Sequence, residues 1–192
     1  IFSGCVNEDS IVSHPTSHQQ IDSTLTADAE TVNVVASVAE DAADDPAVWV
    51  NAKNPEKSFV IGTNKTKGLD VYDLNGNMVF NNDAGRINNV DVRYGFRLSA
   101  DSRVDIVAGS NRSTNSISIF KINSSGTLDV MHSRLLGSSL NEVYGFCLYK
   151  DPQTKKFYAF INGKSGGIEQ WELTATPNGM IDGRVVRTLR VD

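Results

Sequence analysis

The sequence predicts an all-β protein with the architecture of a β-propeller. From Asp44 onward, short segments rich in β-branched and aromatic residues alternate with turn signals, and the 3.6-residue spacing of an amphipathic helix is hard to find. One unit also occurs three times in succession, as expected for the blades of a propeller. A chain of 192 residues that is 40% hydrophobic is long enough to bury a sizeable core.

The amino-terminal residues 1–41 have the composition of a tether. From Val6 to about Asp41 the chain is polar and shows no sustained period. Before it, Phe2-Ser3-Gly4-Cys5 is similar to the lipobox of bacterial lipoproteins, whose cysteine is lipidated after signal-peptide cleavage. We therefore expect an extracytoplasmic envelope protein, periplasmic or secreted, with membrane attachment through a lipid on Cys5. The alternative is that Cys5 is incidental in a truncated sequence.

The second cysteine, Cys147, lies in an apolar run of strand-forming residues. Two cysteines cannot form the disulfide framework of a small secreted domain. Cys147 is expected to be a buried, unreactive thiol.

The body of the chain, residues 42–192, contains the three repeated units. Each unit is a strand, a small polar turn with one cation, a strand with an aromatic residue near its end, and a glycine turn. The cations are Lys65, Arg112 and Lys164, which are 47 and 52 residues apart. That interval is the size of a four-stranded blade.

Acidic or amide residues begin an earlier strand in each unit. Asp45, Asp91 and Glu142 precede the three cations by 20, 21 and 22 residues. This near-constant spacing predicts equivalent places in each blade, and therefore a ring of alternating carboxylates and cations around one opening of the central channel. Taken singly, each of these residues could equally be a solvated turn charge or a structural turn residue.

Such a ring has the donors and ligands for phosphate chemistry. Lysine and arginine bind phosphate or carboxylate oxygens, and the carboxylates of Asp44, Asp45, Asp91 and Glu142 are the ligand type that Ca²⁺ or Mg²⁺ prefers. The net charge of -5 would repel a polyanion unless a cation bridged the two. A bound cation also lowers the pKa of a bound water, so that the water can attack phosphorus. Tyr144 is either a hydrogen-bond donor to a phosphate oxygen or a half-buried aromatic residue of the sheet.

The sequence lacks the motifs that several other classes of function require. The charges are spread without long single-sign blocks, which disfavours nucleic acid as a partner. There is no Gly-x-Ser-x-Gly elbow, Walker loop, Cys/His zinc spacing or histidine cluster. No apolar run approaches the roughly 18 residues of a membrane helix. Metal-assisted hydrolysis is the reaction type that remains.

Seven motifs in order then carry a resemblance to a known family. They are Asp44–Trp49, Thr63–Lys65, Gly68–Leu74, Asn88–Tyr94, Ser110–Ser113, Glu142–Phe146 and Gly163–Lys164. From about Ala42 to the end, the chain resembles the bacterial β-propeller phytases. The resemblance implies a six-bladed enzyme, monomeric when complete, that removes phosphates from phytate (myo-inositol hexakisphosphate) in a cleft with several Ca²⁺ ions.

The resemblance also implies roles for individual residues. Lys65, Arg112 and Tyr144 would hold the phosphate that is cleaved, and Lys164, with Lys67 and Asn111, a neighbouring phosphate. Asp44 or Asp45 would belong to the calcium cluster, to which the ring argument adds Asp91 and Glu142. Where many family members have a second lysine after the first, this chain has Thr66.

The chain contains about three blades where the family has six, so we expect a partial sequence that lacks later calcium ligands. Three blades alone would leave open sheet edges. Two alternatives to the phytase reading follow. One is a propeller fragment that binds a polyanion or a partner without catalysis. The other is a different calcium-dependent propeller hydrolase, for example one that acts on lactones.

Overall fold

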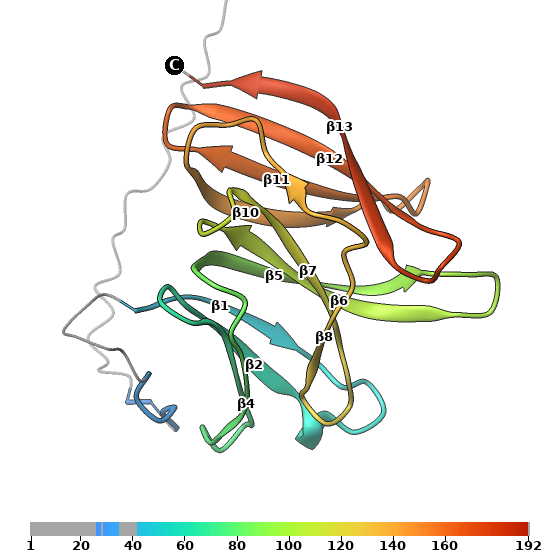
Figure 1. Ribbon diagram of the computed structural model, residues 1–192. Coiled ribbons are helices and arrows are strands. Elements are labelled where there is room, and N and C mark those ends of the chain that lie inside the picture. The colour runs from blue at the N-terminus through green and yellow to red at the C-terminus, as the bar shows by residue number, and fades with distance from the viewer. Residues whose placement is uncertain (1–25, 28, 35–41, 192) are drawn as a thin grey trace, which may run out of the picture.

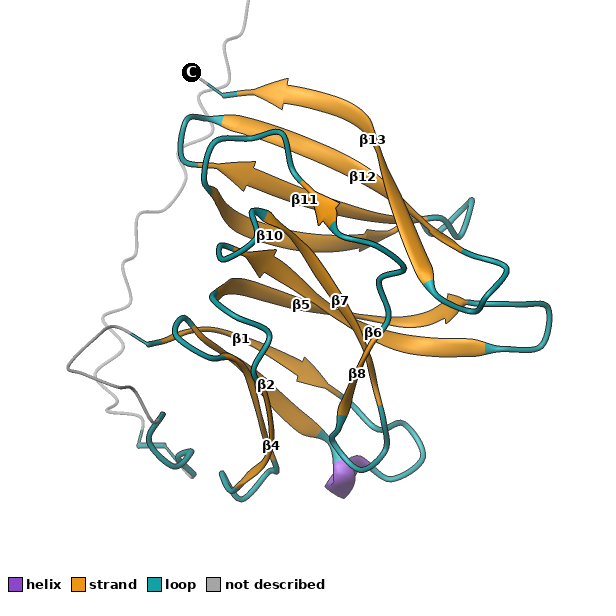
Figure 2. Ribbon diagram, in the orientation of Figure 1, coloured by secondary structure: helices purple, strands orange, loops and turns teal. Residues whose placement is uncertain are grey.

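Three antiparallel sheets make up the computed structural model, which describes residues 26, 27, 29–34 and 42–191 (Figure 1). Figure 2 shows that strands dominate the fold, with one short 3₁₀ helix at Pro55–Lys57. The prediction of an all-β chain with about three propeller blades is confirmed. Cys5 and most of the expected tether lie outside the described residues.

Each sheet is a meander in which consecutive strands pair. Sheet A contains β1 (Ala43–Trp49), β2 (Phe59–Asn64), β3 (Gly68–Tyr72) and β4 (Met78–Asn82). Sheet B contains β5 (Ile87–Arg97), β6 (Arg103–Asn111) and β7 (Ser116–Ile122), with β8 (Leu128–Val130) and β9 (Leu136–Gly137) both paired to β7. Sheet C contains β10 (Val143–Lys150), β11 (Phe157–Gly163), β12 (Gly167–Ala175) and β13 (Ile181–Arg190).

The first strands of the three sheets are neighbours, because β5 contacts both β1 and β10. In Figure 1 these strands run from left to right, and the turns between second and third strands gather on the left. This is the arrangement of propeller blades, whose first strands line the channel. It brings the start of each first strand and the cation-bearing turn to the same end of the molecule.

Two apolar layers hold the blades together. Between sheets A and B the buried residues include Ile61, Val71 and Phe120. Between sheets B and C they include Ile119 and Trp171. Side chains alternate along a strand, so the middle sheet B supplies one face to each layer. Burial of each large side chain stabilises the fold by about 1.5–3 kcal/mol.

Cys147 is exposed, so the expectation that it is buried is wrong. Of the residues of β10, Val143 and Leu148 pack in the layer against sheet B, whereas Tyr144 and Tyr149 are also exposed. The apolar run therefore has one covered and one open face among the described residues. Partial burial raises the pKa of the Cys147 thiol, and the charge of Asp91 raises it further, so the thiol is protonated at neutral pH.

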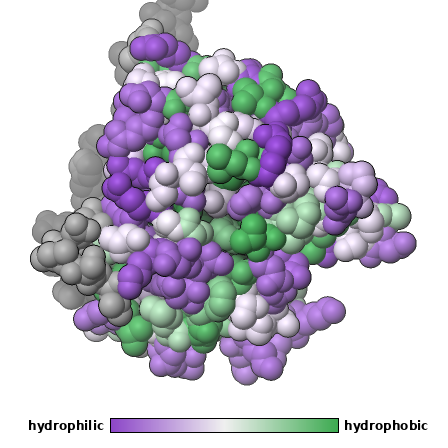
Figure 3. Space-filling view, in the orientation of Figure 1, coloured by the Kyte–Doolittle hydropathy of each residue, from purple (hydrophilic) through white to green (hydrophobic). Residues whose placement is uncertain are grey.

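The outer surface is mixed in character. Figure 3 shows small apolar patches separated by hydrophilic residues on the face seen in Figure 1. Among the residues that the structure describes, there is no helix with the length and apolar character needed to cross a membrane.

Candidate anion-binding site

The three predicted cations occupy the same place in each blade. The backbone N–H of each donates to the carbonyl of the residue that precedes the first strand: Lys65 to Ala42 at 2.8 Å, Arg112 to Arg86 at 2.8 Å and Lys164 to Glu142 at 3.2 Å. The turn between second and third strands thus starts in the same way in all three blades. Because the fold repeats, the cations lie at one end of the molecule.

A buried asparagine shapes the first two of these turns. Asn64 Oδ1 accepts hydrogen bonds from the backbone N–H groups of Thr66 and Lys67, both at 3.1 Å. Its Nδ2 donates to the buried carboxylate of Asp70 at 3.2 Å. Such an Asx turn fixes the backbone that carries Lys65. The Lys67 side chain is exposed beside it.

Asn111 does the same in the second blade, and this corrects its expected role as a substrate contact. The residue is only 4% exposed. Its Oδ1 accepts from Ser113 N at 3.0 Å, and its Nδ2 donates to Ser118 Oγ at 3.1 Å and to the Ala84 carbonyl at 2.8 Å. Its polar atoms are therefore engaged in the fold, and the residue positions Arg112.

Arg112, Glu142, Tyr144 and Lys164 come together between the second and third blades. Glu142 Oε1 accepts a hydrogen bond of 2.6 Å from Arg112 NH2 and another of 2.6 Å from Lys164 Nζ. Arg112 Cζ lies 5.5 Å and Lys164 Nζ 5.3 Å from the centre of the Tyr144 ring. Two cations from different blades therefore converge on one oxygen above an aromatic platform.

The electrostatics of this cluster favour an anion. Hydrogen bonds from Lys164 and Arg112 lower the pKa of Glu142, so its carboxylate is ionised at neutral pH. Glu142 also has a left-handed backbone, with φ of 51°, a strained conformation that recurs at functional sites. Arg112 Nε is buried and has no hydrogen-bond partner in the described part of the chain. The guanidinium thus retains unused binding capacity.

The first strand of each of the three sheets has a β-bulge near its start, at the end of the molecule where the cations lie. In β1, β5 and β10 the pairing with the second strand shifts by one residue, between Ala43 and Pro46, between Ile87 and Val90, and between Val143 and Phe146. Bulges re-aim side chains and are common next to active sites. The residues inside the bulges are Asp44 and Asp45 in the first blade, Asn88 and Asn89 in the second, and Tyr144 and Gly145 in the third.

This register shows that the predicted equivalence of the three acids is wrong. Asp45 lies inside its bulge, Asp91 lies beyond its bulge, and Glu142 precedes its strand. The spacing to the cations was nearly constant only because the first and second strands differ in length between blades. The acids therefore do not form a ring of equivalent carboxylates.

Two of the acids fasten neighbouring blades. Asp45 Oδ2 accepts a hydrogen bond from the backbone of Val90 at 2.9 Å, which joins β1 to β5. Asp91 Oδ2 accepts one from the backbone of Leu148 at 2.8 Å, which joins β5 to β10. Asp91 Oδ1 also binds Arg93 at 2.6 Å. Charge-assisted hydrogen bonds of this kind stabilise by about 1.5–3 kcal/mol.

An acid also pairs with the predicted cation of the first blade, where Lys65 Nζ is 3.2 Å from Asp44 Oδ1. The donor chemistry here suits a hard cation, since Asp44 and Asp45 offer carboxylate oxygens. The buried Oδ1 of Asn88, at the position equivalent to Asp44, has no hydrogen-bond partner in the described ranges. Within those same ranges, however, no three His, Cys, Asp or Glu side chains converge closely enough to hold a metal ion. The oxygens of Asp44, Asp45 and Asn88 therefore fit a metal ion as part of its ligand shell, with further ligands required to complete it.

The buried carboxylate of Glu169 was not predicted from the sequence. Glu169, on β12, is 1% exposed and accepts hydrogen bonds from Ser138 Oγ at 2.8 Å, Trp171 Nε1 at 2.9 Å, and both Oγ and N of Ser139, at 2.5 and 3.0 Å. It fastens the 138–140 segment, which leads into Glu142. The available signal was an acid two residues before Trp171, on a face that is otherwise apolar.

Comparison with known proteins places the chain in a family. The sequence model of the phytase family matches residues 4–192. The 3-phytase of Bacillus subtilis (strain 168) is 42% identical over 175 residues, which cover 88% of this chain and 44% of the relative. The chain therefore spans less than half the length of that relative. A match over almost every residue, in a chain that folds as three propeller blades, shows that this protein belongs to the phytase family.

Proposed function

We propose that the whole protein releases phosphate from phytate by hydrolysis of phosphate monoesters. Membership of the phytase family and the 42% identity to a 3-phytase support this proposal. The observation that carries it is the convergence of Arg112 and Lys164 on Glu142 Oε1, each at 2.6 Å. Two cations already held at oxygen distance from one point form a site in which a phosphate oxygen can take the place of the carboxylate.

In this proposal the residues of the chain bind and orient the phosphate. Arg112 supplies a planar fork of donors and Lys164 a point charge. Tyr144 holds both cations over its ring, and its hydroxyl is a further donor. Lys65, at the equivalent turn of the first blade, approaches the same end of the channel. Donors aimed at charge that develops in the transition state are each worth roughly 10²–10³ in rate.

Calcium is the metal that we propose for the whole enzyme. Asp44 and Asp45 would contribute oxygen ligands. Asn88 Oδ1, which has no partner among the described residues, lies at the equivalent position of the next blade. Bound calcium supplies charge neutralisation and a water of lowered pKa. Asp91 is less suited, because both of its oxygens already accept hydrogen bonds, from Arg93 and from Leu148. Glu142 Oε1 already accepts hydrogen bonds from Arg112 and Lys164.

The cellular location proposed is the bacterial envelope. The lipobox-like segment Phe2-Ser3-Gly4-Cys5 supports attachment through a lipid on Cys5. Metabolic labelling with a radioactive fatty acid tests this, since label should be incorporated by the natural sequence and lost in Cys5→Ala. Equal labelling of both would overturn the attachment.

A second candidate function is binding of a polyanion without catalysis. It is favoured by the lack of converging acidic side chains within the described ranges. The two candidates are separated by measuring phosphate release from phytate by the intact protein, with calcium and with excess chelator. We expect release only with calcium and a loss of about a hundredfold or more in Arg112→Ala, in a variant that still unfolds cooperatively. Full activity in chelator would refute the calcium proposal, and tight phytate binding without release would favour the second candidate.

A further inference from the structure

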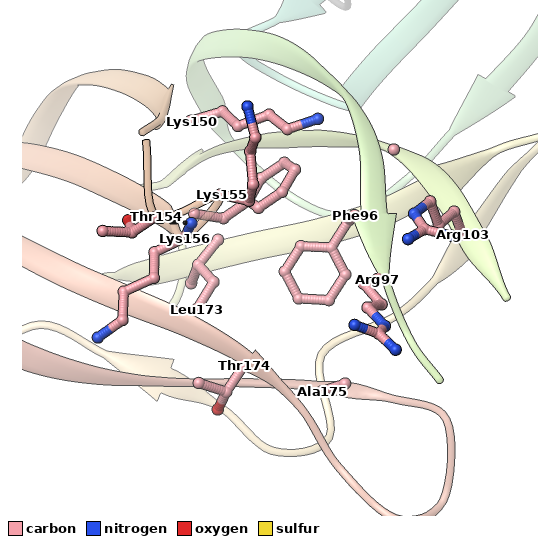
Figure 4. A pocket seen from close by; sticks show the side chains of 12 residues that line it. Phe96, Arg97, Arg103, Lys150, Thr154, Lys155, Lys156, Leu173, Thr174 and Ala175 are labelled. Atoms are coloured by element: carbon pink, nitrogen blue, oxygen red, sulfur yellow. Dashed lines mark hydrogen bonds between the residues drawn. The ribbon is translucent and has the colours of Figure 1, made fainter. Parts of the chain in front are cut away.

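A second basic site lies at the opposite end of the blades. A pocket of about 530 Å³ opens there between the second and third blades (Figure 4). It is formed by the hairpin that joins β5 to β6, the hairpin that joins β10 to β11, and the end of β12. Tyr144 and Lys150 lie near the two ends of β10, and six residue steps along the strand separate them by about 20 Å. The pocket is therefore distinct from the candidate anion-binding site.

The pocket is strongly cationic although the whole chain has a net charge of -5. Its walls contain Arg97, Arg103, Lys150, Lys155 and Lys156. No aspartate or glutamate is among the described residues that line it. A focused positive region on an acidic protein attracts anions selectively.

Most of these cations have binding capacity to spare. The side chain of Arg103 makes no hydrogen bond or ion pair with any residue that the structure describes, although its backbone pairs with Arg97. Arg97 donates through Nε to Ser99 O at 3.0 Å, which leaves its two terminal nitrogens. Lys150 Nζ lies over the Phe157 ring at 5.1 Å and donates to Tyr94 O at 2.8 Å. Lys156 is the exception, because it pairs with Glu172 at 2.6 Å.

Lys155 provides an independent indication that the pocket has a function. Its backbone is left-handed, with φ of 60°, a conformation in which glycine or asparagine is comfortable and lysine is not. The hairpin is well made around it, since Asp151 O accepts from Lys155 N at 2.9 Å and Asp151 Oδ1 from Gln153 N at 2.8 Å. A cation thus occupies a turn position that favours glycine or asparagine. Strained backbone of this kind clusters at functional sites.

The shape of the pocket indicates more than one anionic group. In Figure 4 the ring of Phe96 lies between the two arginines on one side and the lysines on the other. Cations on both sides of the pocket are suited to a compact molecule with several phosphates. A volume of about 530 Å³ is in the range of small-molecule sites.

We propose that this pocket binds a small molecule that carries several phosphate groups. The phosphates would bind Arg97 and Arg103 on one side and Lys150 and Lys155 on the other. The proposal does not depend on catalysis at the other end of the blades. It requires only charge complementarity and the geometry of the two hairpins.

The test is a calorimetric titration of phytate into the intact protein in calcium-free buffer. The background variant carries Arg112→Gln and Lys164→Gln, which weaken the candidate anion-binding site. Onto it are added either Arg103→Gln with Lys155→Asn, or the control pair Lys53→Gln with Lys57→Gln. Both pairs remove two positive charges, and the control lysines are exposed residues of the first blade. Asparagine tolerates the left-handed turn, so the pocket variant should fold.

We expect the pocket pair to weaken binding about tenfold or more and the control pair to leave it within twofold. Equal effects of the two pairs, or none, would overturn the proposal. In an otherwise natural background the pocket pair should leave phosphate release unchanged, which separates this result from a failure of the proposed function. Sedimentation with phosphatidylglycerol vesicles forms the second arm. Pocket-dependent binding to vesicles that free phytate cannot displace would reassign the site to a lipid surface and overturn the small-molecule assignment.

Discussion

Glu142 of the third blade accepts a 2.6 Å hydrogen bond from Arg112 of the second blade. The carboxylate thus binds Arg112, the cation that the family resemblance implies would bind the phosphate. Because Lys164 binds the same oxygen, Glu142 occupies the point where the two positive charges meet. We infer that it competes with an incoming phosphate.

Glu142→Gln should therefore tighten phosphate binding. The substitution removes the competing charge and keeps the shape of the side chain. With this charge removed, the inhibition constant of inorganic phosphate should fall several-fold. Inhibition of phosphate release measures it, with the exposed Glu56→Gln as the control. Weaker phosphate binding, together with a higher calcium requirement, would instead identify Glu142 as a metal ligand.

The same contact should depend on pH in a defined direction. Lys164 and Arg112 lower the pKa of Glu142 in the folded protein. A lowered folded-state pKa adds stability that is present above the unfolded value of about 4.3 and is lost as the pH falls through the folded value. The difference in melting temperature between the natural protein and Glu142→Gln should thus be constant near neutral pH and vanish in acid. A difference that grows in acid would contradict this assignment.

Tyr144 has two separable roles. Tyr144→Phe removes the hydroxyl and keeps the platform under Arg112 and Lys164, so kcat/KM should fall by about tenfold or less. Tyr144→Ala removes the platform as well, and two cation–π contacts of about 1 kcal/mol each predict a further loss of roughly thirtyfold. Steady-state kinetics on both variants measures the two contributions. Identical losses would show that the ring itself does not position the cations.

Glu169→Gln should destabilise the protein by about 2 kcal/mol. Burial raises the pKa of Glu169, but hydrogen bonds from Ser139, Ser138 and Trp171 lower it overall, so the residue is ionised in the core. An amide nitrogen in place of one oxygen would face a donor, and a buried unsatisfied donor costs about 1–3 kcal/mol. Urea unfolding measures the loss, with Glu56→Gln as the exposed control. A change below about 0.5 kcal/mol would show that these hydrogen bonds are not maintained in solution.

The fold and the cations could be predicted from sequence because their signals are local. A polar turn with one cation between two β-rich segments is contained in about ten residues, and Lys65, Arg112 and Lys164 repeat within it. The acids could not be placed in this way. Their positions depend on the register of the first strands and on a one-residue bulge in each, which spacing along the chain does not reveal.

The prediction that Cys147 is buried was wrong for a related reason. An apolar run in a strand does not state which face a neighbouring sheet covers, and in β10 only the face toward sheet B is covered among the described residues. Likewise, the family resemblance implied that Asn111 contacts a phosphate. Its buried hydrogen bonds to Ser118 and Ala84 depend on a third strand and a loop that no short motif contains.

The bulge at the start of each first strand has a consequence for the chemistry of such a site. Its two residues lie outside the regular ladder, so the pairing of the strands does not itself require particular side chains there. Asp44–Asp45, Asn88–Asn89 and Tyr144–Gly145 are three solutions at one structural position, respectively anionic, neutral and aromatic. The three blades therefore present different chemistry at the end of the channel on the same strand architecture.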